Sequence, residues 1–477
     1  LELEACRMNN SPVPFIQVDP TSRQLVVSDQ GRMVLSSIKG TVGVCAVAGV
    51  YRTGKSYILN QLAGHDSGFG VGSSVQACTK GIWLWGAPIQ NKTSTPGAPE
   101  YVLLLDTEGL QSLSQTEGHD AKIFCLAILL SSFFIYNSEK AINSAALDQL
   151  SLVAQLTKKI KLHAAGDQDP SQLSEAFPSF LWLLRDFQLD LTDETGAPIS
   201  ASAYLEEALR PQPGASAAVA EQNTTRAAIA SLFPRRACVP LRHPTVGTSL
   251  PDTALKNLPG IDQLHPAFRD GVLGLKKAVF GGIQAKAFGG APATGPMLLS
   301  LAEAYVSSIN AGALPTISTA WQSVLIIEAQ KATEAALSHF RAKSRAAAAA
   351  DPIPREAAWA AEVAAARDEA LAIFRKQALG ASTAEHEARL AAAMAEECQA
   401  AEALMAARSD AMCSQLAASL SSRLATQAQS SPPSDLPVAL ASILREYLSL
   451  SRGPARDAGL DQLASAVSSA VNTALSR

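Results

Sequence analysis

The sequence is short of the features that mark several large classes of protein. Its seven cysteines are scattered, odd in number and never form a CxxC pair, which argues against a disulfide framework and against a zinc site. The 39 basic and 43 acidic residues are nearly balanced, so no positive excess favours binding to nucleic acid. The longest apolar run, 123–136, is shorter than the roughly 20 residues that span a bilayer, and it contains two serines. We therefore expect a cytoplasmic protein of a reducing compartment, without a transmembrane segment.

Length and composition leave room for more than one domain with an apolar core. The chain has 477 residues, of which 47% are hydrophobic and 17% are charged. As far as residue 288, short apolar runs alternate with helical stretches and with loops rich in glycine and proline, the pattern of a mostly parallel sheet flanked by helices. The predicted strands lie at 15–18, 25–27, 42–48, 81–87, 101–106, 126–136, 180–185 and 237–241.

Beyond residue 290 the strand signals stop and alanine dominates. Apolar residues in 321–340 recur at steps of three and four, which predicts an amphipathic helix. A second helical stretch, 355–429, follows a pair of prolines. We therefore predict an α/β domain at 1–290 and an all-α bundle or stalk at 291–477. A partly disordered, alanine-rich tail is the alternative for the end of the chain.

One segment matches a phosphate-binding loop, or P-loop. Residues 49–56 read Gly-Val-Tyr-Arg-Thr-Gly-Lys-Ser between an apolar run and a helix start, which is the context that such a loop needs. Gly49 and Gly54 let the backbone turn its N–H groups towards a phosphate, and Lys55 can reach the β- and γ-phosphates. The Ser56 hydroxyl can hold Mg²⁺, and the helix N-terminus favours anions. The segment predicts nucleotide binding, against the alternative of an ordinary tight turn.

A second element supplies the metal side of this site. The apolar run 101–105 leads into Asp106-Thr107-Glu108-Gly109, so Asp106 can reach the Mg²⁺ shell and the Gly109 N–H can approach the γ-phosphate. Thr79 lies between the two elements, where a GTPase-type switch places a threonine whose hydroxyl completes the Mg²⁺ shell. A strand ending in a solvated acidic turn is the alternative for Asp106.

The sequence also contains candidates for reading the base and for stabilising the transition state. No NKxD motif is present, but Arg185 and Asp186 end an apolar strand, where the carboxylate can accept the N1–H and the N2 amino group of guanine. Adenine offers neither donor in that geometry, although a strand-end ion pair would place the same residues there. Arg52 lies inside the P-loop and could act as an arginine finger in cis, or be an exposed loop arginine.

These motifs together resemble the guanylate-binding proteins, which are large GTPases of the dynamin superfamily. The resemblance rests on the segments 50–57, 76–83, 106–109 and 184–187. It extends to Tyr136-Asn137-Ser138, which looks like the family's central strand, and to 305–316, which looks like its entry into the helical domain. Beyond about residue 340 only the helical character is similar.

The resemblance implies a role for each candidate residue. Arg52, Lys55, Thr79 and Glu108 become catalytic, and Ser56, Thr79 and Asp106 become ligands of Mg²⁺. Residues expected to contact the nucleotide are Gly49, Tyr51, Arg52, Thr53, Gly54, Lys55, Ser56, Tyr57, Gly109, Arg185 and Asp186. Family members dimerise through their GTPase heads when GTP is bound, and some hydrolyse GTP in two steps to GMP. We therefore expect GTP and GDP as ligands and a homodimer or higher oligomer.

Three departures from the family's pattern bear on this expectation. Ala77 replaces the serine that animal members carry two residues before the switch threonine, which keeps open the alternative of a slowly hydrolysing, GTP-dependent scaffold. An Asp-Arg pair near the guanine cap appears here as Arg242-His243. The helical part is shorter than in animal members and has no lipidation cysteine, so no feature supports membrane anchoring. An ATPase with this P-loop is a further rival, against which Arg185-Asp186 argues.

Overall fold

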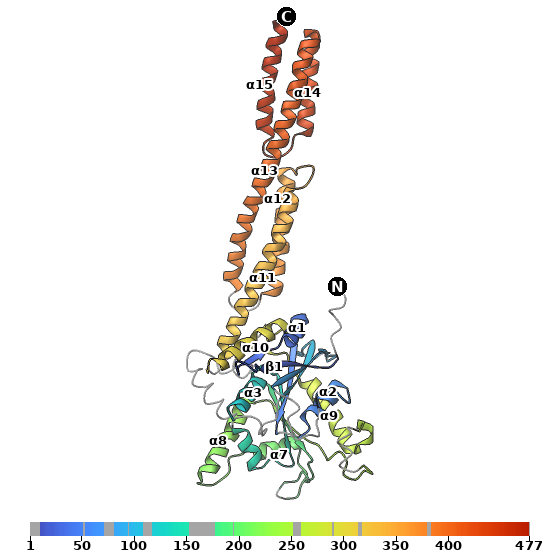
Figure 1. Ribbon diagram of the computed structural model, residues 1–477, viewed down its shortest axis with the longest axis vertical. Helices are drawn as coiled ribbons and strands as arrows, with labels where there is room; N and C mark the ends of the chain where they lie inside the picture. The colour runs from blue at the N-terminus through green and yellow to red at the C-terminus, as the bar shows by residue number, and fades with distance from the viewer. Residues whose placement is uncertain are drawn as a thin grey trace. The chain divides into compact units, whose positions relative to one another are not determined.

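The computed structural model of the chain describes residues 10–50, 53–70, 81–93, 95–107, 117–151, 177–193, 195–250, 259–288, 291–312, 317–378 and 383–476. These residues form two compact units, which divide between residues 324 and 325. Figure 1 shows a sheet covered by helices in the first unit and only helices in the second. The predicted class, an α/β domain followed by an all-α region, is confirmed.

The first unit is built on one sheet, whose strands within the described residues follow the order β2-β1-β4-β6-β3-β7-β8-β9. Strands β6, β3, β7, β8 and β9 run parallel, whereas β2, β1 and β4 continue the sheet in antiparallel fashion and β5 pairs with β6. The strands are β1 (Pro12–Val18), β2 (Leu25–Val27), β3 (Val42–Gly49), β4 (Ile82–Trp85), β5 (Ile89–Gln90), β6 (Tyr101–Thr107), β7 (Phe133–Glu139), β8 (Ser179–Arg185) and β9 (Arg236–Pro240).

Helices cover both faces of this sheet because its central strands are apolar on both faces. Every residue of β3 is buried, as expected for a parallel strand between two layers of helices. On one face, Val47 and Leu104 pack in a cluster with side chains of α2 and α9, while α3 packs against β3 and β6. The helices are α1 (Asp29–Ser37), α2 (Lys55–Ala63), α3 (Glu117–Leu130), α4 (Ser144–Gln149), α7 (Ala201–Ala208), α8 (Ala217–Leu232), α9 (Pro266–Gly282) and α10 (Gly295–Asn310).

Two sequence predictions differ from the structure in their limits. The strand predicted at 126–136 is wrong in its first half, because 126–130 belongs to α3 and β7 begins at Phe133. Both elements are buried, so the apolar residues run on without the polar positions whose spacing would distinguish a helix from a strand. Helix α10 lies beyond the predicted domain boundary at residue 290, yet it packs against α1, α3 and β2 of the first unit. The boundary between family domains stays a prediction.

Lys286 of the first unit is a buried lysine close to the end of α3. Lys286 is 4% exposed, and its Nζ donates a hydrogen bond of 2.9 Å to the carbonyl of Ser131, directly after α3. Burial lowers the pKa of Lys286 to about 7, because the charged ammonium loses its hydration there. Its charge therefore depends on pH in the neutral range.

The second unit consists of long helices that share two apolar clusters. Helices α11 (Ile317–Ala348), α12 (Glu356–Gln377) and α13 (Thr383–Ser430) contribute to the first cluster, in which buried alanines allow close helix packing around Phe340, Phe374 and Met394. The second cluster joins α13 to α14 (Leu436–Leu450) and α15 (Arg456–Leu475), so the structure describes helices where a disordered tail was the alternative. None of the described helices combines the length and the apolar character that crossing a membrane requires.

Candidate functional site

The candidate site lies where β3 leads into α2. Gly49 ends the strand with φ +147°, and Gly54 precedes the helix with φ +76° in the left-handed region. A Cβ on Gly49 would overlap the carbonyl oxygen of Asn137, and one on Gly54 would lie 2.8 Å from Nη1 of Arg185. Backbone conformation and space therefore both favour glycine at these positions. The loop places the N-terminus of α2, whose first N–H groups have no partner within the helix, at the carboxyl end of the sheet.

Side chains inside the loop hold its backbone in place. The Thr53 hydroxyl donates to the carbonyl of Val50 over 2.8 Å, and Nζ of Lys55 donates to the same carbonyl over 3.0 Å. Both side chains are almost fully buried, at 6% exposure each. Lys55 thus lies across the loop, where its ammonium group carries the positive charge that a bound phosphate needs.

Asn137 on the neighbouring strand β7 forms hydrogen bonds to the loop. Its Nδ2 donates to the Thr53 carbonyl over 3.0 Å and to the Thr53 hydroxyl over 2.6 Å. The residue is fully buried and pairs in register with Gly49, so side chain and backbone of one residue contact both ends of the loop. From the sequence, Asn137 stands out only within Tyr136-Asn137-Ser138, which resembles a strand of the family. A polar residue at the end of the apolar run Phe133–Tyr136 was the signal that could have marked it.

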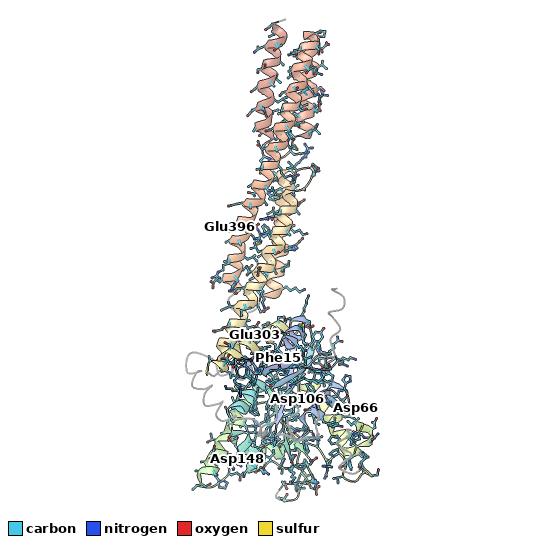
Figure 2. The ribbon with its side chains drawn as sticks, in the orientation of Figure 1. Phe15, Asp66, Asp106, Asp148, Glu303 and Glu396 are labelled. Carbon is cyan, nitrogen blue, oxygen red and sulfur yellow. The ribbon has the colours of Figure 1, made fainter. Side chains whose placement is uncertain are left out.

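The structure brings the two predicted metal ligands that it describes into contact. The Ser56 hydroxyl donates to Oδ2 of Asp106 over 2.7 Å. Asp106 is fully buried, near the end of β6 and next to Val47 of β3. Figure 2 labels it inside the α/β unit. A hydroxyl and a carboxylate oxygen are hard donors of the type that Mg²⁺ prefers, so the residues present fit that ion.

Arg185 reaches the same loop from the end of β8. Its Nη1 lies 3.2 Å from the Thr53 carbonyl and 3.4 Å from the Gly54 carbonyl, and its guanidinium lies 5.6 Å from the centre of the Phe268 ring. The residue is 8% exposed, and this burial lowers the pKa of the guanidinium, an effect that the nearby Asp186 carboxylate opposes. In this structure Arg185 therefore contacts the phosphate loop itself.

Two further predicted residues flank this arginine. Asp186 is half-buried and has φ +56°, a conformation uncommon for an aspartate, at the turn that follows β8. The Tyr57 ring lies 6.3 Å from that of Phe268, and burial raises the pKa of Tyr57 to about 12. Both residues thus act electrostatically on Arg185: the Asp186 carboxylate raises the pKa of Arg185, and the Arg185 charge lowers the pKa of Tyr57 against the effect of burial.

Not all predicted site residues can be placed. Gly49, Thr53, Gly54, Lys55, Ser56, Tyr57, Asp106, Arg185 and Asp186 belong to the described residues, and the contacts above join most of them into one site. The remaining predicted residues lie outside the described residues: Tyr51, Arg52, Thr79, Glu108 and Gly109. Their roles stay predictions.

Comparisons with known proteins identify the family of the chain. The family model for the N-terminal domain of guanylate-binding proteins matches residues 22–285, and that for the C-terminal domain matches 289–433. The chain is 39% identical over 340 residues to human guanylate-binding protein 2, covering 69% of this chain and 56% of that protein. It is 36% identical over 335 residues to human guanylate-binding protein 1, covering 69% and 55%. The chain thus spans little more than half the length of these relatives. It belongs to the guanylate-binding protein family.

Proposed function

We propose that this chain binds GTP together with Mg²⁺ and hydrolyses it to GDP. The single observation that carries the proposal is the contact of 2.7 Å between Ser56 Oγ and Asp106 Oδ2, next to a loop whose glycines and lysine suit a phosphate. Two sequence segments 50 residues apart meet there in the arrangement that a P-loop GTPase uses.

The loop would bind the phosphates by means of its backbone and its lysine. The N-terminus of α2 directs N–H groups and a favourable field towards an anion. Lys55 would exchange its bond to the Val50 carbonyl for one to a phosphate oxygen. Because Asn137 and Arg185 already hold the carbonyls of Thr53 and Gly54, this end of the loop would need little further ordering on binding.

Ser56 and Asp106 are the described residues that would hold Mg²⁺, and Thr79 is the third proposed ligand. When bound there, the ion would supply positive charge that offsets the charge of the phosphates. The Ser56 hydroxyl now donates to Asp106, and it would turn its lone pair outwards while the Asp106 carboxylate stays in place on β6. The roles of Arg52 as an internal arginine finger and of Glu108 in positioning the attacking water follow from the family resemblance.

Asp186 is the proposed reader of guanine. Its carboxylate can accept two hydrogen bonds from guanine, whereas ATP would leave it without a donor. Arg185 precedes Asp186 and contacts the Thr53 and Gly54 carbonyls. The proposed guanine-binding residue is therefore adjacent in sequence to a residue that contacts the phosphate loop. Dimerisation of the heads, a second cleavage to GMP and a cytoplasmic location are further parts of the proposal, and they rest on family membership.

Nucleotide turnover at several protein concentrations tests the proposal. We expect GTP-selective turnover in the presence of Mg²⁺, with a specific rate that rises with protein concentration if heads dimerise. Lys55→Ala should lose GTP binding, and the control Glu396→Gln, an exposed carboxylate in the helical unit, should change nothing. Equal use of ATP would remove Asp186 as the guanine reader.

The alternative function is a GTP-dependent scaffold that hydrolyses slowly. The observation that favours it is Ala77, which stands where animal members have a serine. Tight GTP binding with slow turnover at every protein concentration would support the scaffold. Restoration of faster turnover by Ala77→Ser would attribute the slow rate to that position.

A further inference from the structure

A groove of about 950 Å³ lies in the helical unit, where α12 begins beside α13 and where α14 turns into α15. Figure 1 shows these four helices, which belong to one compact unit. The volume is within the range of small-molecule sites. No residue of the groove belongs to the site described above, and α14 and α15 lie beyond the segment that the family models match.

Two helix N-termini open onto this groove. Arg355 and Glu356 begin α12, Arg456 begins α15, and all three residues line the groove. Neither N-cap residue, Arg355 or Ala455, caps its helix with its own side chain among the described residues, although the Ala455 N–H donates to Ser409 Oγ and the Arg456 N–H to the Gly453 carbonyl. Both helices are long, with 22 and 20 residues, so each presents N–H groups and a partial positive charge to the same space.

The arginines around the groove have no carboxylate partner among the described residues, whereas several other arginines of this unit pair with glutamates. Within the described part of the chain the Arg355 side chain makes no hydrogen bond, while the side chains of Arg452 and Arg456 donate only to the carbonyls of Ser451 and Leu448, over 2.8 and 3.4 Å. The paired arginines of the same unit are Arg341, Arg345, Arg375, Arg389 and Arg423. Three guanidiniums are therefore available to an external anion.

A buried hydroxyl adds a separate indication of a ligand. Ser451 lines the groove with 1% of its surface exposed, and its Oγ has no hydrogen-bond partner among the residues that the structure describes. Buried hydroxyls are normally paired, because an unpaired one forfeits the bond that it makes to water. An acceptor from a bound molecule would satisfy it.

The remaining lining residues limit what the ligand can be. Glu356 and Glu402 oppose the three arginines, which leaves one net positive charge and disfavours a polyphosphate. Trp359, Met405 and Leu448 supply apolar surface for a carbon body. We propose that the groove binds a small organic phosphate ester, with its phosphate on the arginines and helix N-termini and its body on these apolar side chains.

Calorimetric titration of the full chain with phenyl phosphate, phenol and inorganic phosphate tests the proposal. We expect phenyl phosphate to bind more tightly than either part alone. Arg452→Gln should weaken it at least tenfold, and Ser451→Ala should weaken it severalfold without loss of thermal stability, since it removes an unpaired hydroxyl. The matched control is Arg445→Gln, which removes an exposed arginine of α14 that has no carboxylate partner in the described part of the chain and does not line the groove.

Two further arms separate the possible sources of binding. In a Lys55→Ala variant, the binding of phenyl phosphate that depends on Arg452 should persist. Its persistence would show that phenyl phosphate binds in the groove and not at the phosphate loop of the first unit. Phosphatidylcholine vesicles with phosphatidic acid should retain the protein in an Arg452-dependent manner if the ester is a lipid headgroup, and should not retain it if the ester is soluble. Phenyl phosphate binding that is unchanged by Arg452→Gln and Ser451→Ala would overturn the proposal.

Discussion

Replacing Asn137 tests whether the phosphate loop is pre-formed by the neighbouring strand. Asn137→Ala removes two buried hydrogen bonds, at 3.0 and 2.6 Å, to the Thr53 carbonyl and hydroxyl. Each such bond contributes about 0.5–1.5 kcal/mol net. We therefore expect the free energy of unfolding to fall by about 2 kcal/mol, with a further part from the cavity left behind. The Thr53 carbonyl keeps its bond to Arg185, which limits the loss.

The same substitution should weaken nucleotide binding separately from stability. The two hydrogen bonds stabilise the loop conformation that binds GTP over its other conformations. If their loss makes this conformation about 1.4 kcal/mol less favourable, the dissociation constant for GTP rises about tenfold. Urea denaturation and equilibrium titration with a fluorescent GTP analogue measure the two quantities on the same variant. Asn137→Asp, which keeps the shape of the side chain but sets a buried carboxylate oxygen against the Thr53 carbonyl, should lower stability and GTP affinity at least as much.

The residue after Asn137 offers a matched control. Ser138 is also buried, and its hydroxyl accepts a hydrogen bond of 2.9 Å from Nε1 of Trp182 on β8, away from the loop. Ser138→Ala should cost about 1 kcal/mol or more of stability and leave GTP affinity unchanged. Our reasoning would be refuted if both variants weakened GTP binding equally, or if Asn137→Ala lowered stability alone.

Three further predictions concern single positions. Gly49→Ala forces a methyl group against a backbone carbonyl and should prevent stable folding, whereas Gly196→Ala, with φ +82° and open space, should cost only about 1 kcal/mol in a urea titration. The pKa of Lys286 is lowered to about 7 from 10.5, so the unfolded state binds more protons between these values. Stability should thus rise by about 2 kcal/mol from pH 7 to pH 9, and Lys286→Met should abolish that rise; an unchanged pH profile would contradict the assignment. Ser56→Ala and Asp106→Asn should each lower GTP affinity about tenfold in Mg²⁺ but little in EDTA, as equilibrium binding under both conditions would reveal.

The pattern of the sequence by itself determined the fold class and most of the elements. The run 42–48 is apolar throughout and becomes β3, and the glycines at 49 and 54 mark the loop that follows it. The three- and four-residue steps after residue 317 likewise specify helices. Such signals are local, which is why the run 126–136, buried in both conformations, was the segment that they failed to divide.

Only the tertiary structure decided which distant side chains meet. The position of β7 next to β3 puts Asn137 behind Thr53, 84 residues earlier, and β8 delivers Arg185 to the same loop from 132 residues away. The groove of the second unit likewise joins the starts of α12 and α15, and no periodicity within either helix predicts that meeting. Strand order and helix packing depend on the whole apolar core, so these contacts cannot be read from any single segment.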